Sequence, residues 1–132
     1  MLKISQKLEY AIRAMIELAV RRPSGELVPA REIAAAQQIP LRFLEHQLGA
    51  LGRAGLVESF WGAGGGCRLA RDPAEITVAE VLRALDGDTQ IAPCNEGMTL
   101  CHRFEGCDIR DPLASLNRAV MQVFDQMSIA QL

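Results

Sequence analysis

The sequence predicts a mainly α-helical domain that contains one β-hairpin. Aliphatic residues recur every three or four positions in several segments, which is the period of a helix with one buried face. Between two of these segments, two short apolar runs flank a glycine-rich stretch, the pattern of two strands and a turn. Apolar residues make up 49% of the 132 residues and aromatic residues only 5%, so we expect one domain with aliphatic helix packing.

The first helix is predicted over residues 6–20. Ser5 is a suitable N-cap, and Pro23 and Gly25 follow as helix breakers. The apolar face comprises Leu8, Ala11, Ile12, Met15, Ile16 and Ala19. This single stripe predicts that the helix packs along one side against the rest of the domain.

Two further helices follow in close succession. Pro29 suits the first position of a short helix over residues 29–38, which Pro40 ends. A third helix over residues 41–55 has a natural stop at Gly55. Its inward side chains are expected to be Phe43, Leu44, Leu48 and Leu51. Two short helices joined by a turn of about three or four residues form a helix-turn-helix.

A hairpin is predicted next, with strands over residues 56–61 and 67–69 around the glycine-rich residues 62–66. The glycine run lacks the Gly-Lys-Ser/Thr ending and the following helix of a phosphate-binding loop. A hairpin directly after a helix-turn-helix is a wing. We therefore predict a winged helix-turn-helix DNA-binding domain over residues 1–87.

A fourth helix is predicted over residues 76–85, where Thr77 and Glu80 form a capping box and Gly87 ends the helix. Residues 88–110 form a cysteine-containing loop. A last helix runs from residue 111 to about residue 127, and its apolar face comprises Leu113, Leu116, Val120, Val123, Phe124 and Met127 at near-heptad spacing. A two-fold mate is the simplest cover for this face. Residues 111–132 are thus predicted to be a dimerisation helix of a homodimer, with the first helix contributing.

Charge is distributed unevenly along the chain. Residues 1–71 contain ten Lys/Arg and six Asp/Glu, a net of +4, whereas residues 72–132 contain four and ten, a net of −6. A basic first half favours a polyanion partner on one side of the molecule, namely double-stranded DNA. The alternative is that these are scattered, solvated charges.

The third helix carries the candidate base contacts near its N-terminal end, where recognition helices meet base edges. These residues are Arg42, Glu45, His46 and Gln47. Arginine can pair with guanine, and glutamate can accept a hydrogen bond from cytosine. The candidate phosphate contacts, which position a protein without reading sequence, are Lys3, Lys7, Arg31, Arg68 and Arg71.

No targeting or membrane segment is expected. No apolar run approaches the roughly 18 residues of a membrane span, and the N-terminus lacks the cleavage site of a signal peptide. We therefore expect a cytoplasmic protein with no membrane partner.

In a reducing compartment, clustered cysteines favour metal binding or reactivity over disulfides. No Ser/His/Asp set is present, so we expect no enzyme.

Three cysteines, Cys94, Cys101 and Cys107, are spaced C-x6-C-x5-C on the predicted loop. Disulfide partners, metal ligands, redox-sensing thiols and buried small residues are all open from the spacing. Thiolates are preferred ligands of cluster iron, and zinc is the rival metal. A three-cysteine site needs a fourth group, for which the local candidates are His102, Glu105, Asp108 and Asp111. Cys67 on the wing is expected to be a small packed residue.

The chain resembles the IscR–NsrR–RirA family of bacterial regulators. The resemblance is carried by the segment VPAREIAAAQQIPLRFLEHQLGALGRAGLVESFWGAGGGCRLARDPAEITVAEVLRAL, and above all by its AGLV helix exit, its GxGGGxRLAR wing and the cysteine triplet beyond it. It implies a dimeric winged-helix transcription factor that holds a [2Fe-2S] or [4Fe-4S] cluster and reports iron, nitric oxide or redox state. It also implies that Arg42, Glu45 and His46 read the operator.

The resemblance further implies the ligands of the cluster. Cys94, Cys101 and Cys107 correspond to the family's cysteines. Glu9 aligns with the acidic ligand that the other subunit supplies in the nitric-oxide sensors, with His102 and Asp108 as rivals. At the position of another relative's ligating histidine this chain has Arg110, which has no acceptor nitrogen.

The function predicted from these observations is a homodimeric DNA-binding repressor or regulator whose operator affinity is controlled by an iron–sulfur cluster. Two alternatives remain. One is a cluster-free regulator that acts as a thiol switch through cysteine oxidation. The other is a metal-binding carrier that borrows the fold.

Overall fold

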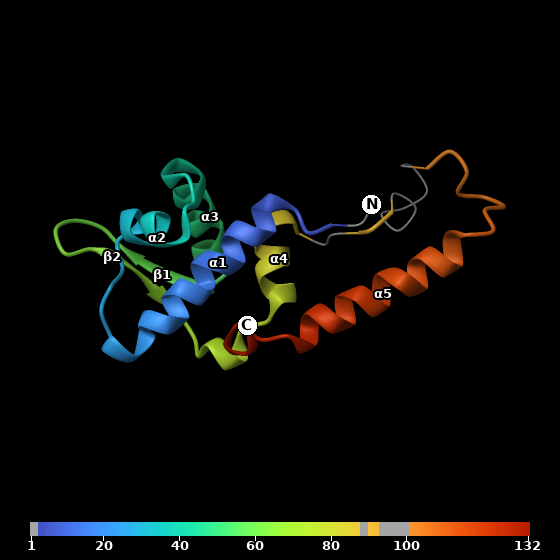
Figure 1. Cartoon of the computed structure of the whole chain (residues 1–132). Helices are drawn as coiled ribbons and strands as arrows, with labels where there is room; N and C mark the ends of the chain where they lie inside the picture. The colour runs from blue at the N-terminus through green and yellow to red at the C-terminus, as the bar shows by residue number, and fades with distance from the viewer. Residues whose placement is uncertain (1–2, 88–89, 93–100) are drawn as a thin grey trace.

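The computed structural model describes residues 3–87, 90–92 and 101–132. Its main elements are α1 (Gln6–Arg21), α2 (Ala30–Gln37), α3 (Leu41–Arg53), β1 (Val57–Phe60), β2 (Gly66–Leu69), α4 (Val78–Asp86) and α5 (Arg110–Gln126). Short 3-10 turns occupy Arg22–Ser24, Pro73–Glu75 and Ile129–Gln131. The mainly helical winged fold predicted from the sequence is confirmed (Figure 1).

Helix α1 runs through the centre of the winged domain. The Ser5 hydroxyl accepts a hydrogen bond from the Leu8 N–H at 3.2 Å, which satisfies one of the donors left free at the helix start. The buried face comprises Leu8, Ala11, Ala14, Met15 and Leu18. Helix α1 therefore supplies the side chains against which the helix-turn-helix and α4 pack.

The helix-turn-helix consists of α2 and α3. Pro29 is the N-cap of α2 rather than its first residue, because its extended backbone precedes the first helical turn. Gln38 adopts a left-handed conformation (φ 55°), and the Ile39 N–H donates to the Ala34 carbonyl at 3.0 Å, so the chain reverses within a few residues. Gly55, with a φ of 76°, ends α3 as predicted, since this backbone conformation strains residues with a Cβ.

The wing is an antiparallel pair in which Val57 lies opposite Leu69 and Phe60 opposite Gly66. A third segment joins it: the Val28 N–H donates to the Cys67 carbonyl, and the Cys67 N–H to the Val28 carbonyl, both at 2.9 Å. The wing is thus hydrogen-bonded to the segment that leads into α2.

Helix α4 starts at the predicted capping box. The Thr77 hydroxyl accepts from the Glu80 N–H at 3.2 Å, and a Glu80 carboxylate oxygen accepts from the Thr77 N–H at 2.9 Å. Gly87 follows as the C-cap. Helix α4 packs against α1, α3 and α5, and so connects the winged domain to the last helix.

The chain returns to the core after α5. The Val78 N–H donates to the Met127 carbonyl at 2.9 Å, and the Ile129 N–H to the Ile76 carbonyl at 2.8 Å. The side chain of Ile129 is only 2% exposed. The last residues are therefore part of the winged domain, while α5 extends away from it and carries residues 101–109 at its far end (Figure 1). In the described part of the chain, no helix is long and apolar enough to cross a membrane.

Phe43 departs from its predicted position. Leu44, Leu48 and Leu51 are buried as expected, but Phe43 is 40% exposed. Its ring lies edge-on to that of Tyr10, with 5.5 Å between the centroids. Phe43 therefore covers the side of α1 instead of entering the core.

Candidate nucleic-acid interface and cysteine loop

The outer side of α3 exposes three of the four candidate base-contacting residues. Arg42, Glu45 and His46 are exposed in the N-terminal half of the helix. They project outward because Leu44 and Leu48 hold the opposite side of the helix in the core. A guanidinium, a carboxylate and an imidazole side by side offer donors and an acceptor to base edges.

Gln47 does not belong to this set. Its side chain is 1% exposed, and its Nε2 donates to the Lys7 carbonyl at 2.5 Å. Gln47 lies three residues after Leu44 and four before Leu51, and this helical spacing could have revealed its buried position. The residue links α3 to the first turn of α1 and is not available to DNA.

Three of the five predicted phosphate contacts form ion pairs. The pairs are Lys7–Asp86 at 2.6 Å, Arg68–Glu58 at 2.8 Å and Arg71–Glu80 at 2.6 Å. All six side chains are between about a third and a half exposed, where such a pair is worth about 0–1 kcal/mol. A phosphate contact through any of these cations would require its pair to open.

Of the predicted DNA-contacting cations, Lys3, Arg31 and Arg42 remain without an ion pair in the described residues. All three are exposed, and within residues 3–87, 90–92 and 101–132 none of them forms an ion pair. Arg31 stands at the start of α2 and Arg42 at the start of α3. One arginine without an ion pair in the described residues therefore stands at the N-terminal end of each helix of the helix-turn-helix, where the helix dipoles also favour anions.

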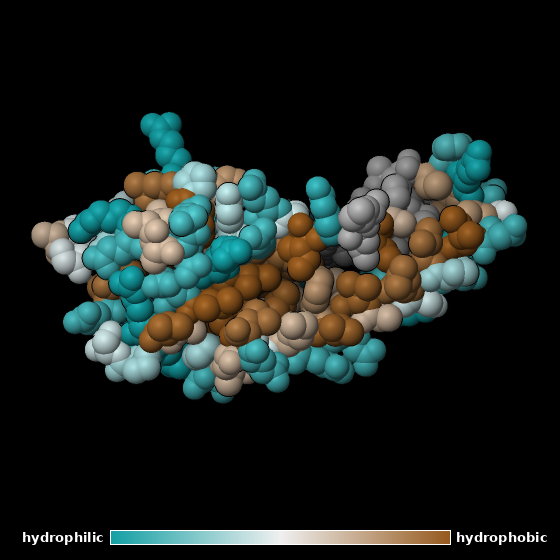
Figure 2. Space-filling model, in the orientation of Figure 1, coloured by the Kyte–Doolittle hydropathy of each residue, from teal (hydrophilic) through white to brown (hydrophobic). Residues whose placement is uncertain are grey.

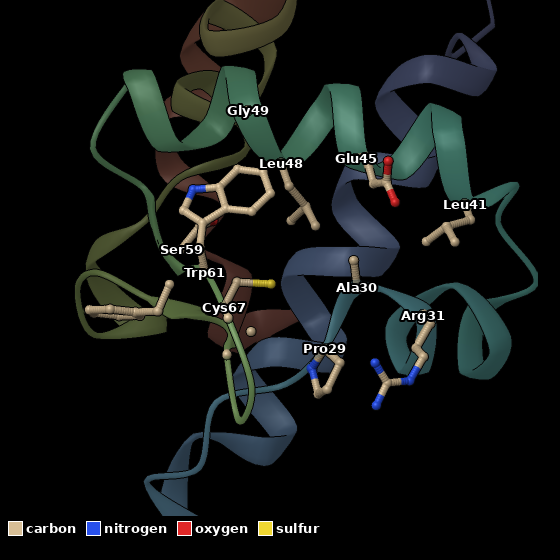
Figure 3. Close-up of a pocket in the computed structure, with 14 residues that line it drawn as sticks. Pro29, Ala30, Arg31, Leu41, Glu45, Leu48, Gly49, Ser59, Trp61 and Cys67 are labelled. Atoms are coloured by element: carbon tan, nitrogen blue, oxygen red, sulfur yellow. The ribbon is translucent and has the colours of Figure 1, made fainter.

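A groove separates α3 from the wing (Figure 3). It has a cavity volume of about 520 Å³, and Glu45 and Leu48 of α3, Arg31 of α2 and Trp61 of the wing are among its lining residues. Cys67 also lines it, but this thiol is 2% exposed and donates to the Val28 carbonyl at 3.3 Å. Burial raises the pKa of Cys67 to about 11, so the thiol stays protonated and unreactive at neutral pH.

The cysteine loop is described in its second part, and Cys94 lies outside the described residues. Cys101 and Cys107 are half-buried free thiols. The Phe104 N–H donates to the Cys101 carbonyl at 3.2 Å, and the Arg110 N–H to the Cys107 carbonyl at 3.4 Å. Two accessible, unbridged thiols on successive turns suit thiolate ligation of soft iron.

Arg110 holds these two turns together. Its guanidinium lies 4.9 Å from the centroid of the Phe104 ring, and its Nη1 donates to the Phe104 carbonyl at 3.2 Å. It also pairs with Asp111 at 3.3 Å. Arg110 thus orders the loop between the two described cysteines, although it cannot ligate a metal.

The predicted fourth ligands are distributed over two places. His102, Glu105 and Asp108 are exposed on the loop itself. Glu9 lies on α1, where it pairs with Arg13 at 2.9 Å, away from residues 101–109 at the far end of α5 (Figure 1). Among the residues that the structure describes, no group of three His, Cys, Asp or Glu side chains is gathered around a common point.

Comparison with known proteins gives consistent similarities. The profile of the Rrf2 family, described as iron-dependent transcriptional regulators, matches residues 4–132. The regulator NsrR of Bacillus subtilis is 33% identical over 99% of this chain and 90% of its own length. Among solved structures, IscR of T. potens has a TM-score of 0.79 and 29% identity over 98% of this chain and 85% of that one. CymR, the global cysteine regulator of B. subtilis, has a TM-score of 0.80 and 29% identity over 99% and 95%.

Proposed function

The chain belongs to the Rrf2 family of transcriptional regulators, and from this we propose a homodimeric repressor or regulator whose operator affinity is controlled by an iron–sulfur cluster on the cysteine loop. It is a transcription factor and not an enzyme. The observation that carries the DNA-binding part is the exposed trio Arg42, Glu45 and His46 at the N-terminal half of α3. In a helix-turn-helix this is the part of the recognition helix that meets base edges in the major groove.

Two residues of the trio and two further cations have specific proposed roles. Arg42 pairs with a guanine through its two-pronged guanidinium, and Glu45 accepts from a cytosine amino group. Arg31 and Lys3 contact phosphates, which position α3 in the groove without reading sequence. These cations form no ion pair with any carboxylate in residues 3–87, 90–92 and 101–132, which supports this assignment, because no such pair has to open before DNA binds.

Helix α5 is the proposed dimer contact. None of its 17 residues is buried within one chain, although it is amphipathic. Leu116 is 47% and Val123 is 53% exposed, and apolar side chains follow α5 and continue onto α1 (Figure 2). A contiguous apolar surface of this kind marks an interaction site. A second copy is the proposed occupant, because two recognition helices in a dimer reach successive major grooves.

The cysteine loop is the proposed cluster site. Cys94, Cys101 and Cys107 would supply three thiolates, and a non-cysteine group would complete the site. Glu9 of the other subunit is the proposed fourth ligand, with His102 and Asp108 as rivals. When bound, an iron–sulfur cluster would provide a centre that reacts with oxygen, nitric oxide or electrons.

Contacts that join the end of α4 to α3 through Lys7 of α1 support a regulatory link. Lys7 Nζ donates to the Leu85 carbonyl at 3.1 Å and to Asp86 at 2.6 Å, at the end of α4 just before the loop. The carbonyl of the same Lys7 accepts from Gln47 of α3. A change in the loop that moves the end of α4 would therefore reach the recognition helix through one residue. A coupling of about 1–3 kcal/mol is typical of such regulation.

Two measurements on one preparation test the proposal. Protein purified without oxygen should be brown and contain iron and sulfide, and its affinity for an operator selected from random duplexes should change when the cluster is removed. The second candidate, a thiol switch, is favoured by the unbridged state of Cys101 and Cys107. It predicts colourless protein whose operator affinity changes on mild oxidation and recovers with a thiol reductant.

A further inference from the structure

Asn117 of α5 holds the chain that leads into the cysteine loop. Its side-chain Oδ1 accepts from the Ile91 N–H at 3.0 Å, and its Nδ2 donates to Gln90 Oε1 at 2.7 Å. Ile91 lies outside any helix or strand, so its N–H bonds to this side chain and not to a backbone ladder. Both hydrogen-bonding ends of one half-buried amide therefore fix residues 90–91 to the helix.

The other end of the loop is fixed to the same part of α5. Arg110 contacts the Phe104 carbonyl at 3.2 Å and the Phe104 ring at 4.9 Å from its centroid. Gln90 and Phe104 also line one cavity of about 360 Å³, to which Arg110 and Asn117 contribute. Arg110 and Asn117 are seven positions apart, which is about 10 Å along a helix. The two ends of the loop are thus anchored close to one another.

Each cysteine of the loop is close in sequence to one of these anchored residues. The pairs, each separated by three positions, are Cys94 and Ile91, Cys101 and Phe104, and Cys107 and Arg110. Three residues of chain span at most about 11 Å, so each cysteine is tethered near its own anchor. The chain between the first and second anchors could extend over about 40 Å. The contacts with α5, and not the covalent chain, therefore bring the anchors together.

We propose that Asn117 is a positioning residue of the cysteine loop, which holds residues 90–91 on α5 and so keeps Cys94 within reach of the other two loop cysteines. This inference rests on the proposed role of the three cysteines as one ligand set. Without Asn117, the chain before Cys94 would next be held at Gly87, the C-cap of α4, seven positions away instead of three. The local concentration of a tethered group falls roughly as the −3/2 power of the tether length, which is about a fourfold loss here.

Disulfide equilibria in the metal-free protein measure this local concentration without a cluster. In mixtures of reduced and oxidised glutathione, two protein thiols give up two hydrogens to form one disulfide, while one oxidised glutathione becomes two reduced molecules. The equilibrium constant of the bridges that contain Cys94, identified by peptide mass spectrometry, gives their effective concentration. Asn117→Ala should lower this value about fourfold. The bridge between Cys101 and Cys107 is the internal reference and should not change.

Two further variants separate the Ile91 contact from a general effect on α5. Asn117→Asp keeps an acceptor for the Ile91 N–H and should restore most of the effective concentration. Gln122→Ala removes an amide from an exposed position of the same helix and should match the wild type. Hydrogen exchange at the Ile91 amide should be slow in the wild type and in Asn117→Asp, and faster in Asn117→Ala. Sedimentation verifies the dimer, because Asn117 lies about 100–120° around the helix from Leu116 and Val123.

The same variants connect the contact to the proposed cluster. After anaerobic reconstitution with iron and sulfide, Asn117→Ala should lose its visible absorption several-fold faster than the wild type when a chelator is added. Asn117→Asp should stay close to the wild-type lifetime.

The possible outcomes are distinct. A wild-type effective concentration in Asn117→Ala would overturn the inference, and so would equal losses in Asn117→Ala and Asn117→Asp. If the wild type stays colourless after reconstitution but Asn117→Ala still shows the fourfold loss, the positioning role of Asn117 is supported and the proposed cluster is refuted instead.

Discussion

Val123→Glu should dissociate the dimer. Complete burial of a valine or leucine side chain is worth about 1.5–3 kcal/mol, and Leu116 and Val123 retain about half of their exposure, 47% and 53%, within one chain. Covering that half contributes about 1 kcal/mol per side chain. Two-fold symmetry doubles each term, so loss of Val123 alone removes about 2 kcal/mol, or about 30-fold in the dissociation constant of the dimer. Two carboxylates placed in the interface weaken it further.

Sedimentation equilibrium over a range of protein concentrations measures this constant. Gln122→Glu is the matched control, because it adds the same charge to α5 about half a turn away from the apolar face, at an exposed position. The control should remain dimeric and retain tight operator binding, whereas Val123→Glu should lose both. A wild type that sediments as a monomer, or a Val123→Glu variant that associates as tightly as the wild type, would refute the assignment of α5 as the dimer contact.

Three further variants test other parts of the molecule. Arg42→Ala should lose about 1–3 kcal/mol of operator binding but little non-specific binding in a competition assay. Arg53→Ala removes the same charge at the other end of α3 and should preserve the preference for the operator over non-specific DNA. Cys101→Ala should abolish the visible absorption of anaerobically purified protein with an unchanged far-ultraviolet circular dichroism spectrum, and Cys67→Ala should leave the absorption intact; the opposite result would move the cluster to the wing. Burial opposes ionisation of Glu80, but hydrogen bonds from the Thr77 N–H and from Arg71, with the charges of Arg71 and Arg83, lower its pKa overall. The contribution of ionised Glu80 to the free energy of unfolding is therefore present at neutral pH and is lost as the pH falls through the lowered pKa. Glu80→Gln should accordingly lower the melting temperature at pH 7 more than under acidic conditions.

The helix ends are predictable from the sequence because capping is local. Ser5 and Leu8, or Thr77 and Glu80, lie three positions apart, so the residues that make each cap are visible together. The wing is predictable for a similar reason, since two β-prone runs flank one glycine-rich turn. The strand boundaries differ by a residue or so, because pairing and not propensity decides where a ladder ends.

Helix periodicity is less informative than local capping patterns, because it does not fully predict which side chains of α3 are buried. Phe43 is apolar but 40% exposed, and Gln47 is polar but 1% exposed. The Phe43 ring packs against Tyr10 of α1, and the Gln47 side chain donates to the Lys7 carbonyl. Both partners come from a helix more than thirty residues earlier in the chain, so no pattern within α3 reveals them.

Contacts across long sequence separations are the part that the sequence does not reveal. Lys7 and Asp86 are 79 positions apart, and their ion pair converts an expected phosphate contact into a link between α1 and α4. Ile129 has no periodic apolar neighbours, yet it is buried in the winged domain. The roles of Arg42, Glu45, His46 and the cysteines follow from residue type and family resemblance and stay predictions.

The return of the chain to the core after α5 has a mechanical consequence. Met121 and Phe124 pack against the winged domain and act as a fulcrum, while residues 110–120 form a lever arm about 16 Å long at 1.5 Å per residue. A displacement of about 3 Å at the loop end of this arm would turn the helix by about 10°. Helix α4 meets α5 close to this pivot, on the side away from the cysteines. A small force applied to α5 at the cysteines would therefore reach α4 as a larger force that acts over a shorter distance.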